Sequence, residues 1–295
     1  MDVTNELEAW AVVGGIIVLN WVLHLIIPQS SEPAYVLDEH SKKPLQYRFN
    51  GLKVHIAVIL IFSLLVLIGL VDGAYLHTHI WSCVRCGCFL GLIVPTLLFI
   101  DGLRTLSLEG NERHNTKIYR YPTAPTTLRP SGVGDFSEFN SRNLLQHFYC
   151  GYKFNPRFRL LCRVDVKMFL YIVGANLLHL NILSAVVYHS QNLQDAAAGV
   201  SLFGSHRLTV AMLVYIGLFS WFVIEYLYHE KVHAFTYDLF RERLGAKLAW
   251  GCLCFYPFFY GIGVSCYYTD SCTQLVYFSK DFNHQRGISV LYTCQ

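Results

Sequence analysis

The residues best suited to chemistry lie between the fifth and sixth apolar segments of the chain. Residues 229–233 read H-E-K-V-H, the H-E-x-x-H spacing. On a helix this spacing puts His229 and His233 one turn apart on the same face, with Glu230 as a possible base. Asp238 follows closely. Two kinds of chemistry suit the stretch: zinc-assisted hydrolysis and proton transfer by a carboxylic acid.

Zinc needs a third protein ligand, and the sequence does not supply one at a familiar spacing. The extended motif would have glycine at 236 and histidine at 239, where this chain has Thr236 and Leu239. A more distant glutamate is missing, because Glu242 is the last glutamate of the chain. We therefore predict no metal site here, and a membrane zinc hydrolase is kept as an alternative.

A second group of possible ligands lies at the start of the third apolar segment. Residues 77–88 read H-T-H-I-W-S-C-V-R-C-G-C. The spacing could suit a metal, but no second pair of ligands elsewhere matches it. We interpret the cysteines as free thiols at the mouth of a helix, or as a disulfide in an oxidising lumen.

The composition is that of a polytopic membrane protein. The chain has 295 residues, of which 54% are hydrophobic and 15% charged, and its mean hydropathy is +0.37. The net charge of +3 and the absence of any block of like charge give no indication of nucleic-acid binding. Residues 2–8 carry three acids and no base, the wrong charge for the start of a signal peptide.

Six apolar segments are long enough to cross a bilayer as helices. The predicted fold is therefore all-α, a membrane helix bundle with about six transmembrane helices in a single domain, 1–295. In the fourth segment three polar residues, Asn176, His179 and Asn181, interrupt the apolar run, so an interfacial helix is its alternative. The segments are Ala9–Ile27, Val54–Val71, Val84–Ile100, Lys167–Tyr188, Leu208–Tyr228 and Leu248–Tyr268.

Basic residues alternate between the connections. The first, third and fifth connections are basic, and the third, residues 101–166, holds ten arginines and lysines. The second and fourth hold almost none. The positive-inside rule then predicts a lumenal N-terminus and a long cytosolic loop at 101–166. In the first connection, 28–47 reads as polar and irregular, and Asn50-Gly51 indicates a turn into the second helix.

A colinear set of short motifs resembles the sterol reductase family. This family includes the sterol C-14, C-7 and C-24(28) reductases and the membrane domain of the lamin B receptor. Residues 47–51 (YRFNG) resemble its Y-[KR]-x-N-G, residues 148–157 (FYCGYKFNPR) its F-F-x-G-x-E-[LF]-N-P-R, and residues 164–169 (VDVKMF) its D-[LIV]-K phrase. Residues 228–231 (YHEK), 236–239 (TYDL), 244–258 and 277–286 resemble W-N-E-E, T-x-D-I, F-G through V-P-F, and Y-x-F-R-x-A-N-x-Q-K. The order holds from about residue 8 to 286.

The resemblance implies a function and a set of residues. It implies NADPH-dependent reduction of a sterol double bond, with C-14 favoured, in the endoplasmic reticulum membrane and the inner nuclear membrane continuous with it. Because the family has W-N-E-E and no metal at 228–231, His229 and His233 would match H-E-x-x-H by chance. Glu230 and Asp238 become the candidate acids, Tyr228 and Tyr237 would relay a proton or hold the sterol hydroxyl, and Arg286 would contact the cofactor phosphates. The remaining motif residues are Gly151, Asn155, Pro156, Arg157, Asp165 and Lys167.

The chain also departs from the family pattern. Family members usually begin with one more helix, and the R-P-G after the D-x-K phrase is absent. The family's C-terminal third, with its H-R-x-x-R-D and K-Y-G motifs and most NADPH contacts, is not in this sequence, and 269–295 forms only a partial C-terminal segment. We therefore expect sterol binding to persist and reduction to be weak unless a partner protein supplies the C-terminal part. A non-catalytic sterol-binding or nuclear-envelope protein is the alternative.

Overall fold

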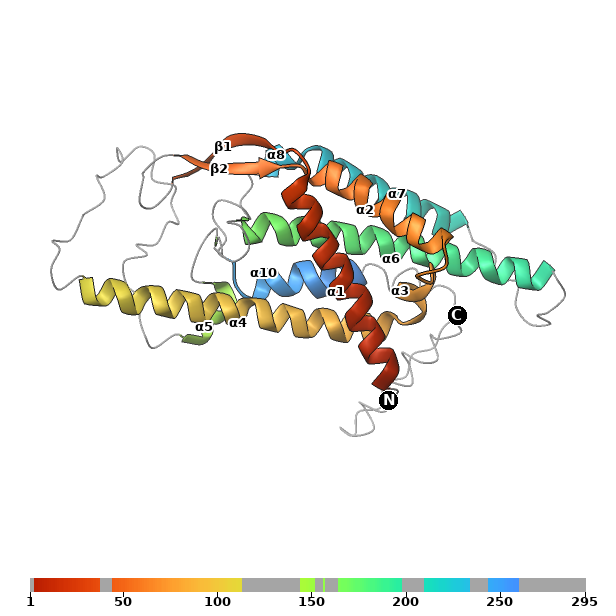
Figure 1. Ribbon diagram of the computed structural model, residues 1–295, viewed down its shortest axis with the longest axis horizontal. Helices are drawn as coiled ribbons and strands as arrows, with labels where there is room; N and C mark the ends of the chain where they lie inside the picture. Colours follow the sequence, from red (N-terminus) through yellow and green to blue (C-terminus); the bar gives the residue numbers. More distant parts are fainter. Residues whose placement is uncertain are drawn as a thin grey trace, which may run out of the picture.

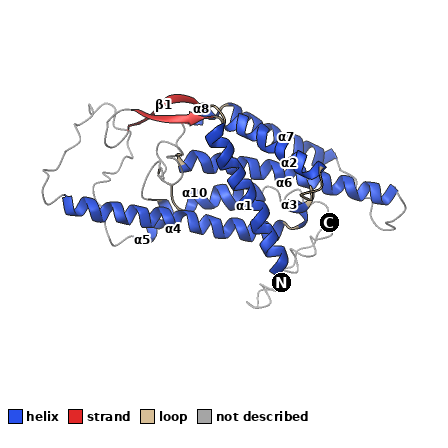
Figure 2. Cartoon of the chain, in the orientation of Figure 1, coloured by secondary structure: helices blue, strands red, loops and turns tan. Residues whose placement is uncertain are grey.

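The computed structural model describes residues 3–37, 44–112, 144–151, 156, 164–197, 210–233 and 244–259. They form a mostly helical bundle with one small hairpin (Figures 1 and 2). The elements in chain order are α1 (Val3–Ile26), β1 (Ser30–Leu37), β2 (Pro44–Phe49), α2 (Gly51–Leu67), α3 (Tyr75–Thr78), α4 (Ile80–Glu112), α5 (Leu144–Cys150), α6 (Val166–Ala197), α7 (Val210–Tyr228), α8 (Glu230–His233), α10 (Ala246–Trp250) and the π-helix η3 (Gly251–Phe259).

Five of the six predicted apolar segments coincide with helices. Three stretches are long and apolar enough to cross a membrane: Glu6–Ile26, Ile80–Asp101 and Val166–Gln191. Gly51–Leu67 and Leu213–Tyr228 are apolar but shorter. The sixth segment begins as α10 and η3, and its end at 260–268 lies outside the described residues. A helical membrane protein is confirmed, whereas the count of six spans is not.

The first connection holds one hairpin in an otherwise helical fold, which corrects the prediction of an irregular segment there. Strands β1 and β2 pair antiparallel, with Ser30 opposite Phe49 and Pro33 opposite Gln46. Alternate residues of a strand point to the same face, and here Tyr47 and Phe49 are both buried, in a cluster with Met168 of α6. Burial of these two rings against the bundle explains why a strand forms where polar composition alone indicated a loop.

The third connection is also more helical than predicted. Helix α4 continues to Glu112, well inside the 101–166 loop, and α5 occupies Leu144–Cys150 within the same loop. Helix α4 begins at Ile80, so the thiols of Cys83, Cys86 and Cys88 lie within it rather than ahead of it. All three are free cysteines.

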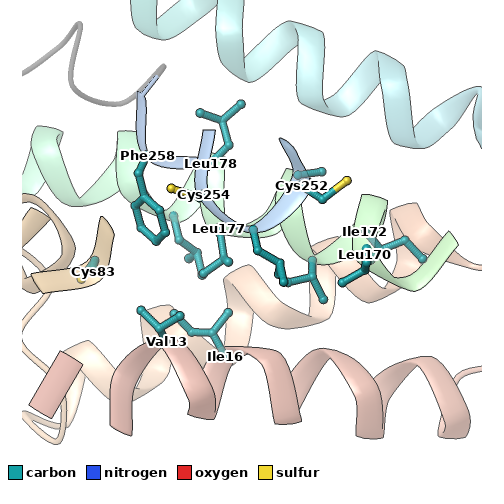
Figure 3. Packing of buried hydrophobic residues seen from close by; sticks show 14 of the residues in the cluster. Val13, Ile16, Cys83, Leu170, Ile172, Leu177, Leu178, Cys252, Cys254 and Phe258 are labelled. Atoms are coloured by element: carbon teal, nitrogen blue, oxygen red, sulfur yellow. The ribbon is translucent and has the colours of Figure 1, made fainter. Parts of the chain in front are cut away.

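Helix α6 is the central element of the bundle. It packs against α1, α2, α3, α7 and η3. Of its membrane-length apolar stretch 78% is buried, against 28% for the corresponding stretch of α1 and 39% for that of α4. Figure 3 shows Leu170, Ile172, Leu177 and Leu178 of α6 in one buried cluster with side chains of α1 and η3. The fourth segment is therefore a core helix and not an interfacial one, and its polar residues are buried inside the protein.

Glycines let the last described segment approach its neighbours closely. A Cβ on Gly174 of α6 would lie 2.7 Å from the carbonyl oxygen of Cys252 in η3. A Cβ on Gly87 of α4 would overlap the carbonyl oxygen of Leu253. Small residues at such positions are a common device for packing helices in membranes, where dispersion contacts replace the hydrophobic driving force. They fix η3 between α4 and α6.

The first, second and fifth connections can be placed at the two ends of the bundle. The hairpin, α8 and the start of α2 lie together at one end of the bundle, and α3 lies at the other end of α2 (Figure 1). At that second end the backbone N–H of His77 donates to Ser184 Oγ at 3.1 Å. The first and fifth connections thus share one end, and the second connection lies at the opposite end.

Which end faces the cytosol stays a prediction from the basic residues. We expect a glycosylation acceptor engineered into the fourth connection, after the end of α6 at Ala197, to be modified in microsomes, and one at 113–143 to stay unmodified, because the basic third connection should face the cytosol. Modification of the third connection alone would reverse the predicted orientation.

Candidate active site around Glu230

The structure describes about half of the residues predicted for the site. Tyr228, Glu230, Gly151, Pro156, Asp165 and Lys167 lie within the described ranges. Asn155, Arg157, Tyr237, Asp238 and Arg286 lie outside them. Roles predicted for this second group stay predictions.

Glu230 is a buried acid joined to the start of another helix. Its side chain is 8% exposed, and its Oε2 accepts a hydrogen bond of 2.7 Å from the backbone N–H of Gly51. Gly51 is the first residue of α2 and leaves room for this contact, since a Cβ there would overlap Oε2 and lie 3.2 Å from Leu227. The YRFNG and YHEK motifs, 179 residues apart, therefore meet at one carboxyl group.

Asn50 connects the start of α2, next to Glu230, to α1. Its Nδ2 donates to the carbonyl oxygens of His24, at 3.1 Å, and Ile27, at 3.0 Å. These are carbonyls at the end of α1, which the helix itself leaves without partners. The Asn-Gly pair thus does more than form the turn expected from sequence. Asn50 fixes α1 to α2, and Gly51 fixes α2 to Glu230.

The electrostatic surroundings of Glu230 favour the protonated form of its carboxyl group. Burial raises the pKa of Glu230 to about 7, and the Gly51 N–H, Lys231 and Lys53 oppose the shift only in part. Desolvation penalises the charged form, while the N-terminal end of α2 stabilises it. At neutral pH the group is therefore present in both forms, as a proton donor should be.

This raised pKa makes stability depend on pH in a specific direction. The folded carboxyl keeps its proton to about pH 7, whereas in the unfolded chain it ionises near its ordinary value of 4.5. The native state therefore binds the extra proton between these values, and stability should fall as pH rises from about 5 to 7. We expect Glu230→Gln, which keeps an acceptor for the Gly51 N–H, to remove much of this fall.

Melting temperatures of detergent-purified protein between pH 5 and 8 measure this effect. Glu225→Gln, the same substitution at an exposed position of α7, is the matched control and should keep the slope. Identical slopes for the native chain and Glu230→Gln would show that Glu230 ionises normally.

Tyr228 and His229, the two residues before Glu230, lie at the surface. Tyr228 is 67% exposed, and its ring lies edge-on to that of His229, which is also exposed, with 4.9 Å between centroids. Of the H-E pair, His229 therefore lies at the surface and Glu230 in the core. Among the described residues no group of three histidine, cysteine or acidic side chains could hold a metal ion.

The remaining motifs build the support of the site. Asp165 Oδ1 accepts the backbone N–H groups of Lys167 and Met168, each at 3.1 Å, and so caps α6. The N–H of Val166 donates to the carbonyl oxygen of Pro156 at 3.0 Å. The N-P-R and D-x-K phrases therefore form one joint at the start of the central helix. The side chain of Lys167 in that joint is fully buried.

A second joint connects α5 to α10. Gly151 has a φ of +95°, a region that side chains other than that of glycine rarely occupy. A Cβ on Gly245 would overlap the backbone at Cys150 and Gly151, and one on Gly151 would overlap Leu244. The F-Y-C-G and L-G phrases thus pack backbone against backbone.

The chain matches a known family over nearly its whole length. A profile of the Ergosterol biosynthesis ERG4/ERG24 family matches residues 2–294. The chain belongs to this family. The predicted resemblance to sterol reductases is therefore confirmed, and the contacts between the described motifs show them meeting in pairs.

Two curated relatives are similar to this ERG4/ERG24 family member. Delta(14)-sterol reductase of Arabidopsis thaliana is 24% identical over 221 residues, which are 74% of this chain and 48% of the relative. Delta(14)-sterol reductase of Methylotuvimicrobium alcaliphilum is 26% identical over 216 residues, 73% of this chain and 40% of the relative. The matched part of the chain thus spans half or less of each relative's length.

Proposed function

We propose that this chain is a sterol double-bond reductase of sterol biosynthesis, that it reduces the C-14 double bond, and that it uses NADPH. Membership of the ERG4/ERG24 family and the two Delta(14)-sterol reductase relatives support the class of substrate and reaction. The observation that carries the proposal is the buried, partly protonated carboxyl of Glu230 on the Gly51 N–H. Reduction of an alkene needs a proton donor, and in this proposal the Glu230 carboxyl is that donor.

The reaction adds a proton to one alkene carbon and a hydride to the other. Glu230 gives its proton to the first carbon, the π electron pair forms the new C–H bond, and the cation left on the second carbon accepts the hydride. Water at the membrane surface then returns a proton to the Glu230 carboxylate. The carboxylate formed in the step also stabilises the neighbouring cation, because both lie where water is largely excluded.

NADPH supplies the hydride when it is bound. Of the residues that resemblance assigns to it, Arg286 lies outside the described ranges. The described residues near Glu230 offer the exposed ammonium groups of Lys53 and Lys231. Two surface lysines do not by themselves form a dinucleotide site, so the proposed proton-transfer steps involve only the protein's own acid. In the same proposal Asp238 and Tyr237 assist Glu230 in proton transfer.

The location of Glu230 suits a reaction between a lipid and a water-soluble reductant. A sterol partitions into the bilayer, whereas NADPH approaches from the cytosol. Glu230 follows directly after the apolar helix α7 and lies at the end of the bundle with the basic first and fifth connections. We place the protein in the endoplasmic reticulum membrane with this end toward the cytosol.

Conversion of defined sterols tests the proposal. Microsomes containing the chain would be given NADPH and, separately, sterols unsaturated at C-14, C-7 or C-24(28), and the products analysed by mass spectrometry. We expect NADPH-dependent loss of the C-14 double bond. Loss of a different double bond would correct the position assigned, and sterol binding with no reduction of any of the three would make the chain a non-catalytic sterol-binding protein.

A further inference from the structure

A chain of polar side chains crosses the apolar core of the bundle, apart from Glu230. It joins three helices: Asn20 of α1, His55 of α2, and Asn176 and His179 of α6. Their side chains are 0%, 3%, 0% and 8% exposed, respectively. All four lie in apolar helices. Ionisable groups in such a position are costly, and their presence suggests a function.

The hydrogen bonds of this polar chain have one consistent direction. Asn20 Nδ2 donates to the backbone carbonyl of Ile16 at 2.8 Å, which leaves Asn20 Oδ1 as an acceptor. Asn176 Nδ2 donates to that oxygen. Asn176 Oδ1 is then an acceptor as well, so the proton it receives comes from His55 Nδ1.

The direction fixes the tautomer of both histidines. With its proton on Nδ1, neutral His55 has a lone pair on Nε2, which accepts a hydrogen bond of 2.9 Å from His179 Nδ1. The two rings are nearly parallel, with 12° between their planes and 5.0 Å between centroids. His179 therefore also carries its proton on Nδ1, and its Nε2 is a hydrogen-bond acceptor.

His179 Nε2 is the open end of the polar chain. Within the described residues no hydrogen-bond donor contacts it, although the side chain is more than nine-tenths buried. His179 Nε2 is not among the fully buried unpartnered atoms, so a group from outside the bundle can reach it, and in apolar surroundings an acceptor gains from such a donor. The bonds between the four side chains already hold the helices together, so this last nitrogen is not needed for that purpose.

We propose that His179 Nε2 accepts a hydrogen bond from the hydroxyl group of a membrane alcohol, and that its occupant is a sterol. The choice of a sterol rests on the proposed function. A sterol matches the site in its chemistry, since it offers one donor on an otherwise apolar body. The assignment places the hydroxyl at His179 and not at Tyr228, which is mostly exposed.

The position of His179 gives the sterol a direction. His55, its partner, lies four residues after Gly51 on α2, which is about 6 Å along the helix axis. The hydroxyl end would therefore lie deeper in the bundle than the Glu230 carboxyl. The ring system would extend from His179 toward the end of the bundle where Glu230 is held.

Binding of a sterol and its methyl ether separates this proposal from a structural role. A photoreactive C-14-unsaturated sterol and its 3-O-methyl ether, which lacks the donor, would be compared in nanodiscs without NADPH. We expect the native chain to prefer the free alcohol by about 3- to 10-fold, the worth of one hydrogen bond. His179→Phe should bind both equally. His229→Phe, at an exposed position outside the polar chain, should keep the preference.

Competition by a long-chain alcohol distinguishes a sterol from lipid alcohols in general. We expect it to compete poorly, and equal competition would overturn the sterol as occupant. No preference in the native chain, or one that survives in His179→Phe, would overturn the hydroxyl site itself. The native-chain comparison holds even if His179→Phe misfolds. A chain that binds the alcohol selectively but reduces no sterol would contradict only the proposed reductase, and one that reduces alcohol and ether equally well would contradict only the His179 site.

Discussion

Gly245→Ala is expected to destabilise the protein by about 3 kcal/mol or more, among the larger effects of a single methyl group. The added Cβ would overlap backbone atoms of Cys150 and Gly151, not a movable side chain. Gly151 cannot easily give way, because its φ of +95° already commits it to a conformation that suits glycine. The joint between α5 and α10 should therefore open.

The matched control is Gly217→Ala in α7, where an added Cβ meets nothing within 4 Å. It should be neutral or stabilising by up to about 1 kcal/mol, because alanine favours a helix. Melting temperatures and yields in detergent compare the two variants. Equal melting temperatures for Gly245→Ala and Gly217→Ala would show that the F-Y-C-G and L-G phrases do not pack as described.

Gly51→Ala is expected to act on the reaction more than on the fold. Its Cβ would overlap Glu230 Oε2, and a carboxyl group at the end of a flexible side chain can move away at modest cost. Displacing it by about 1 Å from its position should lower the reduction rate by about 100-fold. Sterol binding should change little, since the hydroxyl site on His179 is not touched.

Coupling with Glu230 provides the control for this variant. In Glu230→Gln the acid is already lost, so adding Gly51→Ala should lower the rate little further, and the two effects should not be additive. Initial rates of the two single variants and the double variant give the coupling. Fully additive losses would mean that Gly51 affects the reaction by a route other than the carboxyl group.

The helices were largely predictable from sequence, because an apolar run of sufficient length has few alternatives in a bilayer. Helices α1, α2, α4, α6 and α7 lie close to the predicted segments. The hairpin was not predictable in this way, since residues 28–47 have a polar composition. Only the bundle surface at Met168 explains why Tyr47 and Phe49 form a strand.

The site was predictable only in part. Resemblance gave Glu230, but its partner Gly51 lies 179 residues away and looked like a simple turn residue. The polar chain was also missed, although its signal was present. His179 and Asn176 looked like a weakness of the fourth segment, whereas they pair with Asn20 and His55 in other helices. Polar residues in separate apolar helices predict such pairing only when the packing of the helices is known.

The rate of reduction by Glu230→Gln tests the central claim most directly. The variant keeps the size of the side chain and an acceptor for the Gly51 N–H but has no acidic proton. We predict that reduction of a C-14-unsaturated sterol at pH 7 falls at least about 100-fold relative to the native chain, the contribution typical of a general acid, while binding of the same sterol is unchanged. Reduction at the native rate in Glu230→Gln would contradict the assignment of Glu230 as the proton donor.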